Sequence, residues 1–148
     1  MRVLHIITGL SAGGAEMVLY KLLARSDPRK VEAYVVSLTD IGPVGEKIRA
    51  RQVPVRALGM QRGIPDALRL LRLAGWIRRI RPDLIHTWMY HANLAGGLAA
   101  RLAGGLPVVW GIHNTTLTRP ESKRLTIWTD KLCGLLSGWL PARIVCCA

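Results

Sequence analysis

Short runs of apolar residues alternate along the chain with longer segments whose apolar positions recur at helical spacing. The short runs are mostly continuous in apolar residues, which is typical of parallel strands covered on both faces. They predict six strands: Arg2–Thr8, Glu32–Leu38, Val55–Leu58, Asp83–Thr87, Pro107–His113 and Ala142–Cys147. The longer segments predict five helices: Gly14–Arg25, Val44–Gln52, Pro65–Ile80, Met89–Ala103 and Glu121–Leu140. This alternation predicts an α/β fold with a doubly wound, mainly parallel sheet and helices on both faces.

A glycine-rich turn follows the first predicted strand. It reads Gly-Leu-Ser-Ala-Gly-Gly-Ala-Glu from Gly9 to Glu16 and leads into a helix. The expected apolar face of that helix consists of Ala15, Val18, Leu19, Leu22 and Leu23. Glycines permit positive φ and the close approach of a ligand, and the first turn of a helix offers N–H groups that suit a phosphate or carboxylate. The spacing differs from the G-x-G-x-x-G dinucleotide motif, so a tight turn without a ligand remains the alternative.

The composition indicates one folded domain with anionic partners. The chain has 148 residues, half of them hydrophobic, and no phenylalanine, so Leu, Ile, Val and Trp must fill the core. Small residues at Gly96 and Gly97 are expected to allow close packing between a helix and the sheet. The formal net charge of +12 favours nucleotides, nucleic acid or an anionic membrane face, without choosing among them.

The cysteines and apolar segments indicate the compartment. Cys133, Cys146 and Cys147 form neither a disulfide framework nor a zinc motif, and we interpret them as small buried hydrophobic residues in a reducing environment. The apolar run after Arg2 is short for a secretory signal, and no apolar segment reaches the roughly 20 residues that span a bilayer. We therefore expect a cytoplasmic protein, either soluble or peripheral at the inner membrane face.

Polar residues gather where three predicted strands end, and ligands bind beyond the carboxyl ends of strands in open α/β sheets. His113 is the leading candidate because it follows a strong strand and precedes a loop, where it could contact a sugar hydroxyl or transfer a proton. A loop histidine bonded to the backbone is the alternative. The other candidates are Ser11, Gly13, Gly14, Glu16, Thr87, Trp88, Tyr90, His91, Asn93, Asn114, Thr115 and Thr116.

Several of these residues also have structural explanations. Asn93 could cap a helix, and Glu16 could simply favour a helix dipole. His5 and His86 lie within strands, where we expect core residues. No nucleophile elbow or P-loop lysine is present, and the spacing of His86 and His91 disfavours a shared metal.

Two helices combine basic and apolar residues. The third predicted helix carries Arg69, Arg72, Arg78 and Arg79, and the last carries Lys123, Arg124, Lys131, Trp128 and Trp139. We interpret the third as covering the core with a solvated face. Contact with an anionic membrane surface is the alternative for both.

Three segments of the chain follow one another in a recognisable order. Val3–Ile7 leads into Gly-Gly-Ala-Glu at 13–16, Pro82–Trp88 supplies a second strand, and Val108–Asn114 supplies a strand that ends in His-Asn. Together they resemble the retaining glycosyltransferases of family 4. The resemblance covers essentially the whole chain but only the N-terminal half of such enzymes. It implies the GT-B fold, in which two Rossmann-like domains face a cleft.

The resemblance also implies roles for residues. The N-terminal domain receives the acceptor, and the C-terminal domain holds a UDP- or GDP-linked sugar and carries Glu-x7-Glu. Amides of Gly13 and Gly14, with Glu16 beside them, would lie near the donor phosphates or the acceptor. His113 would touch the transferring sugar as the catalytic candidate, supported by Asn114, and His91 and Asn93 would line the acceptor side. The leaving phosphate would help to deprotonate the acceptor on the same face, without metal or other cofactor.

Glu-x7-Glu does not occur in this chain, which ends directly after the last predicted strand. We expect residues 1–148 to be a single, truncated N-terminal domain that lacks the nucleotide-sugar domain and is inactive alone. The whole protein would be a hexosyltransferase of polysaccharide biosynthesis, with a nucleotide-sugar donor, a glycan or lipid-linked acceptor and no specific nucleic acid. The alternative is a stand-alone α/β module that binds a nucleotide or an anionic lipid head group.

Overall fold

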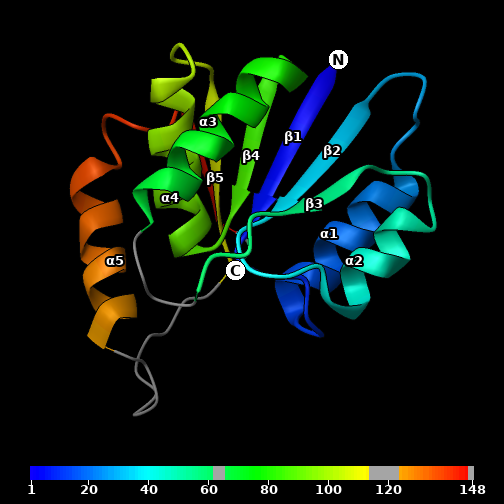
Figure 1. The fold of residues 1–148 in the computed structure, drawn as a ribbon, viewed down its shortest axis with the longest axis horizontal. Helices are drawn as coiled ribbons and strands as arrows, with labels where there is room; N and C mark the ends of the chain where they lie inside the picture. The colour runs from blue at the N-terminus through cyan, green and yellow to red at the C-terminus, as the bar shows by residue number, and fades with distance from the viewer. Residues whose placement is uncertain (62–65, 114–123, 147–148) are drawn as a thin grey trace.

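A six-stranded parallel sheet lies between two layers of helices (Figure 1). A computed structural model describes residues 1–61, 66–113 and 124–146. The strands are β1 (Arg2–Ile7), β2 (Glu32–Ser37), β3 (Val55–Ala57), β4 (Leu84–Trp88), β5 (Val108–Ile112) and β6 (Arg143–Cys146). They are ordered β3-β2-β1-β4-β5-β6, and each neighbouring pair is parallel. The predicted α/β fold class is therefore confirmed.

The helices divide between the two faces of the sheet. They are α1 (Gly14–Arg25), α2 (Gly42–Arg49), α3 (Ala67–Ile80), α4 (Tyr90–Leu102) and α5 (Arg124–Leu136). Figure 1 shows α1 and α2 on one side of the sheet and α3, α4 and α5 on the other. The chain builds the sheet outward from β1 in one direction and from β4 in the other. Right-handed connections therefore place the two sets of helices on opposite faces.

Each predicted strand and helix is present, with ends that differ by a few residues. The helix predicted from Gly14 to Arg25 has these bounds in the structure. By contrast, α5 ends at Leu136 instead of Leu140, because the backbone turns there and the Trp139 amide donates to the Leu136 carbonyl. The predicted helix starts at Pro65 and Glu121 lie outside the described residues.

The larger core lies between the sheet and α3, α4 and α5. Leu4, Ile6, Ile85 and Trp110 point into it from the strands, and α3 covers it with a face that includes Ile77. The core-covering interpretation of α3 is thus confirmed, as is the use of tryptophan in a core without phenylalanine.

Small residues in α4 allow it to approach the sheet, as predicted. A Cβ on Gly96 would lie 2.5 Å from Cγ2 of Thr87 in β4. A Cβ on Gly97 would lie 3.2 Å from Leu140. Any larger residue at Gly96 would push α4 away from the sheet.

The apolar face of α1 is narrower than predicted. Ala15, Leu19 and Leu23 are buried, whereas Val18 is 46% exposed and Leu22 is 43% exposed. Residues four apart lie along one line of a helix, so only this line faces the sheet. The expectation that Val18 and Leu22 belong to the buried face was wrong, because both lie beside this line and are exposed.

The edge strand β6 differs from the other strands because all of its residues are exposed. Cys133 is buried as predicted, but Cys146 is exposed, so the interpretation of Cys146 as a buried residue was wrong. Cys147 lies outside the described residues. Within the described ranges, every helix is too short or too polar to cross a bilayer.

Candidate functional site

The strand order creates a switch point between β1 and β4. These two strands are neighbours, but the chain continues from β1 to β2 on one side and from β4 to β5 on the other. In open α/β sheets, ligands bind in the crevice at the carboxyl ends of strands that diverge in this way. The segments after β1, β4 and β5, each predicted to carry site residues, therefore meet at one edge of the sheet.

The glycine turn brings the start of α1 to this edge. Gly13 is the N-cap of the helix, its φ is −153°, and no side chain caps the helix. The first-turn amides have no partners within the helix and suit an anion. Gly9, Gly13 and Gly14 do not have positive φ, so the expectation that the turn needs glycine for positive φ was wrong. The close approach of a ligand remains a reason for glycine at position 14. A Cβ on Gly14 would meet no protein atom within 4 Å, so the space beside it is open to a ligand.

Glu16 lies back over the glycine turn. A Cβ on Gly13 would lie 2.4 Å from Oε2 of Glu16. The Glu16 carboxylate also influences His113, which follows β5. Burial lowers the pKa of His113 below its ordinary value, and the negative charge of Glu16 offsets part of this effect. Glu16 thus lies against the glycine turn, and its charge acts on His113 at the end of β5.

His113 belongs to a cluster of four rings on the α1 side of the sheet. Its imidazole stacks on the indole of Trp88 at 4.7 Å between ring centroids, with an interplanar angle of 10°. The Trp88 indole donates through Nε1 to Nδ1 of His5 at 3.3 Å. The His86 ring lies 4.6 Å from that of Trp88 and 5.5 Å from that of His5.

The two strand histidines are neutral at pH 7. Burial, followed by the neighbouring His86, lowers the pKa of His5 to about 3. Burial, followed by the neighbouring His113, lowers the pKa of His86 to about 4. The interpretation of His5 as a core residue is confirmed, and His86 is half-buried beside it.

Asn93 points into the fold beneath the site. It is 1% exposed, its Oδ1 accepts from the Thr87 hydroxyl at 2.6 Å, and its Nδ2 donates to the Gly111 carbonyl at 3.5 Å. It therefore ties α4 to β4 and β5. The alternative that Asn93 caps α4 was wrong, because the N-cap is Met89 and no side chain caps this helix.

Of the remaining predicted site residues, His91 is described by the structure and Asn114 is not. His91 lies half-buried in the first turn of α4, where burial lowers its pKa. Asn114 lies outside the described residues. The acceptor contacts predicted for His91 and Asn93 stay predictions.

Sequence reasoning missed the backbone of Met89, between β4 and α4. Its φ of 74° and ψ of 159° form a combination that residues with a side chain rarely adopt. Two hydrogen bonds hold the Met89 backbone in this conformation. The Met89 amide donates to the Gly111 carbonyl, and the Asn93 amide donates to the Met89 carbonyl. Such strain costs on the order of 1–3 kcal/mol and gathers at functional sites. A methionine gives no sequence signal for it.

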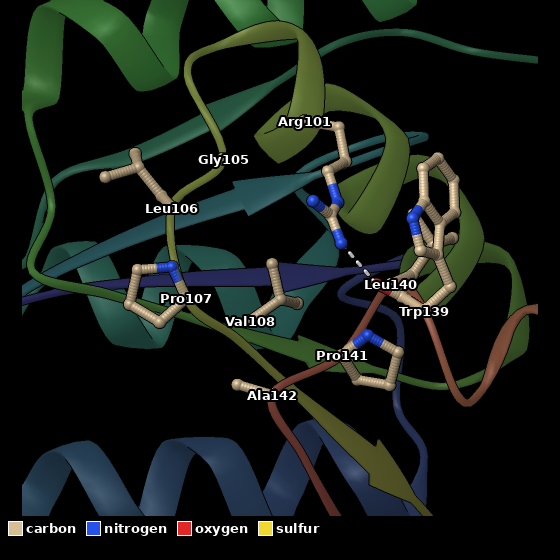
Figure 2. A pocket seen from close by; sticks show the side chains of 9 residues that line it. All are labelled: Arg101, Gly105, Leu106, Pro107, Val108, Trp139, Leu140, Pro141 and Ala142. Atoms are coloured by element: carbon tan, nitrogen blue, oxygen red, sulfur yellow. Dashed lines mark hydrogen bonds between the residues drawn. The ribbon is translucent and has the colours of Figure 1, made fainter.

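A separate hollow of about 150 Å³ lies at the opposite edge of the sheet, where β5 and β6 begin (Figure 2). Pro107 and Pro141 line it. The Arg101 guanidinium covers the Trp139 ring at 4.7 Å from the centroid and donates to the Trp139 carbonyl. This hollow is not part of the candidate site.

The fold matches those of solved enzymes that are larger than this chain. HepE of Anabaena, solved in complex with UDP, has a TM-score of 0.75 at 20% identity, over 97% of this chain and 37% of its own. MurG of Acinetobacter baumannii has a TM-score of 0.66 at 13% identity, over 98% of this chain and 40% of its own. A UDP-N-acetylglucosamine 2-epimerase has a TM-score of 0.64 at 14% identity, over 97% and 41%.

The likeness to these solved structures is limited to the fold and to part of their length. At these identities the solved structures show the fold alone, and the chain spans about two fifths of their length. No curated protein sequence matches the chain. The family model described as Glycosyltransferase Family 4 matches residues 12–148, so the chain belongs to glycosyltransferase family 4.

Proposed function

We propose that residues 1–148 form the acceptor-side, N-terminal domain of a retaining glycosyltransferase of the GT-B type. The whole enzyme would move a hexose from a nucleotide-sugar to a glycan or lipid-linked acceptor in polysaccharide biosynthesis. Family membership supports this assignment. The observation that carries it is the convergence of the segments after β1, β4 and β5, which hold the glycine turn and His113, at the switch point of the sheet.

In this proposal, first-turn amides of α1 bind a phosphate, and His113 contacts the transferring sugar. Because its pKa is lowered, His113 is mainly neutral at pH 7 and contacts the sugar hydroxyl without carrying charge. The leaving phosphate, rather than a metal, helps to deprotonate the acceptor. His91 and Asn114 contact the acceptor and the sugar, and Asn93 holds the start of α4 against β4 and β5.

Titration of the isotope-labelled chain with UDP tests the phosphate site. We expect shifts of the backbone amides of Gly14, Ala15 and Glu16, which lie in the first turn of α1. Gly14→Ala should weaken UDP binding without loss of stability, because its Cβ enters open space in the protein. Gly75→Ala, also with open space at its Cβ but within α3, is the matched control.

The outcomes separate the proposal from its alternatives. Equal UDP binding by Gly14→Ala and Gly75→Ala would remove α1 from the site. Absence of amide shifts at any UDP concentration would remove the phosphate contact altogether. Tight binding of UDP that needs no further domain would favour the stand-alone binding module.

We also propose that the chain attaches to an anionic membrane surface through α5. Trp128, Leu132 and Leu135 follow helical spacing along one face, and all three are exposed. The exposed Lys131 lies beside them, and α5 packs on α4 at the outer edge of the fold (Figure 1). An aromatic and apolar stripe next to a cationic side chain suits an anionic bilayer interface.

Co-sedimentation with vesicles tests this attachment. We expect binding to phosphatidylglycerol–phosphatidylcholine vesicles, but not to pure phosphatidylcholine. Leu135→Ser, at an 82% exposed position of α5, should weaken binding, whereas Leu68→Ser, at a 79% exposed position of α3, should not. Equal binding by the two variants would contradict a docking surface on α5.

A further inference from the structure

We propose that Trp88 is a positioning residue that sets the orientation of His113, with His5 anchoring Trp88 from behind. This inference rests on the role proposed above for His113 and adds a residue that would determine its geometry. The three side chains come from β4, from the end of β5 and from β1, so they connect the strands at the switch point.

The first support is the geometry of the stack. The rings of Trp88 and His113 are nearly parallel, at 10°, whereas the other ring pairs of the cluster are tilted by 36° to 53°. Within the described part of the chain, the buried Nε2 of His113 has no hydrogen-bond partner. The stack, rather than a hydrogen bond at Nε2, therefore holds the imidazole plane.

The second support is the rigidity of the indole itself. Trp88 is 2% exposed and packs with residues of α1 and α2. Its Nε1–H donates to Nδ1 of His5, which is 4% exposed and neutral. A buried indole with a satisfied N–H has few alternative orientations, so it provides a fixed surface for the imidazole.

The third support is the space at Gly111. A Cβ there would lie 3.1 Å from Nε2 of His113 and 3.3 Å from Nε2 of His86. Because Gly111 has no side chain, the Nε2 edges of His113 and His86 can both lie close to it. The indole lies against the face of the His113 imidazole and Gly111 lies at its Nε2 edge, and both limit how the ring can turn.

Nuclear magnetic resonance of the 148-residue chain tests the stack, on which the positioning depends, without activity. In the unchanged chain the ring protons of His113 should be shifted upfield by the ring current of Trp88. Trp88→Leu should abolish this shift, and Trp88→Phe, which keeps an aromatic face, should retain much of it. Trp110→Phe, at an equally buried tryptophan on the opposite face of the sheet, should leave it unchanged.

A second arm measures transfer by the whole enzyme. Trp88→Leu should lower kcat about tenfold or more with a smaller change in KM, because a misplaced contact costs rate, and Trp88→Phe should recover most of the loss. Thermal unfolding shows whether each variant is folded. If Trp88→Leu does not fold, the comparison is made between Trp88→Phe and the unchanged chain.

The two arms fail separately. An unchanged His113 spectrum in folded Trp88→Leu would overturn the positioning, whatever the enzyme does. A loss of transfer in His113→Ala but not in Trp88→Leu would also overturn it. Transfer that is unaffected by His113→Ala would overturn the proposed function of His113, while the spectra would still report the stack.

Discussion

Met89 shows how single residues carry strain at this site. It is one of three described residues other than glycine with positive φ, together with Gln52 and Arg81. Arg81 has the ordinary left-handed conformation of a helix end, at φ 50° and ψ 58°. Met89, at ψ 159°, lies outside that region and next to the switch point. Its strain is thus of a different kind from a helix cap.

Glycine should suit position 89 better than alanine does. Both substitutions remove the methionine side chain, but only glycine relieves the backbone. Met89→Gly should therefore exceed Met89→Ala in free energy of unfolding by about 1–3 kcal/mol. Urea denaturation of the pair measures the difference. Equal stability of the two variants would show that the backbone is not strained.

The strand histidines should make stability depend on pH. In the unfolded chain they titrate near 6.5, whereas in the fold their pKa values are about 3 for His5 and about 4 for His86. Below pH 6.5 the unfolded state binds more protons, so stability falls as the pH falls toward the folded values. At pH 5 each histidine should cost about 2 kcal/mol relative to neutral pH.

Urea unfolding between pH 7.5 and pH 5 measures this dependence. His86→Gln removes one of the two groups and should make the decrease shallower. Arg2→Gln, at the exposed ion pair with Glu32, is a control that leaves both histidines in place. An unchanged decrease in His86→Gln would contradict a buried, neutral His86.

At the scale of elements, α4 controls how the site is assembled. Asn93 and Met89 at its start bond to β4 and β5, and Gly96 one turn later contacts Thr87 of β4. The small residues of α4 were predicted to allow close packing, and the contact at Gly96 gives the reason for one of them. The position of α4 therefore determines where the end of β4 lies.

Alanine should have opposite effects at two helical glycines. Gly96→Ala places a Cβ 2.5 Å from Cγ2 of Thr87. It should destabilise the fold by about 1–3 kcal/mol through overpacking. Gly75→Ala meets no atom within 4 Å in the middle of α3. It should add up to about 1 kcal/mol through helix propensity. Thermal melting compares them, and effects of the same sign would contradict the close packing of α4.

At the scale of the whole molecule, the candidate site has one wall. Its residues lie along a single sheet edge, and the chain spans 37% of HepE, which was solved with UDP. Exposed apolar side chains also gather along α5 and β6. The described part of the chain therefore forms one side of the candidate site.

The isolated chain should transfer no sugar. In the proposal α1 contributes only a phosphate contact and a second domain holds the rest of the donor, so nucleotide release from UDP- or GDP-hexoses should equal the rate without protein. A nucleotide-release assay with a broad set of glycan and lipid-linked acceptors measures this, with an active glycosyltransferase as a positive control. Turnover above the background would show that residues 1–148 suffice, and would overturn the proposed division of labour.

Much of this site could be predicted, since its parts follow strands that are recognisable one by one. His113, Glu16 and the glycine turn were identified because parallel strands present their carboxyl ends at one edge. Trp88 was noted only as a strand-end residue. Its stack on His113 and its bond to His5 could not be foreseen, because 83 positions separate Trp88 from His5.

By itself, the sequence determined the number, kind and order of the strands and helices, because hydrophobic periodicity is a local property of each segment. Only the tertiary structure decided that β4 lies between β1 and β5 and that Asn93 turns inward. The pairing of strands depends on packing between distant segments, and that packing brings His5, Trp88 and His113 into contact.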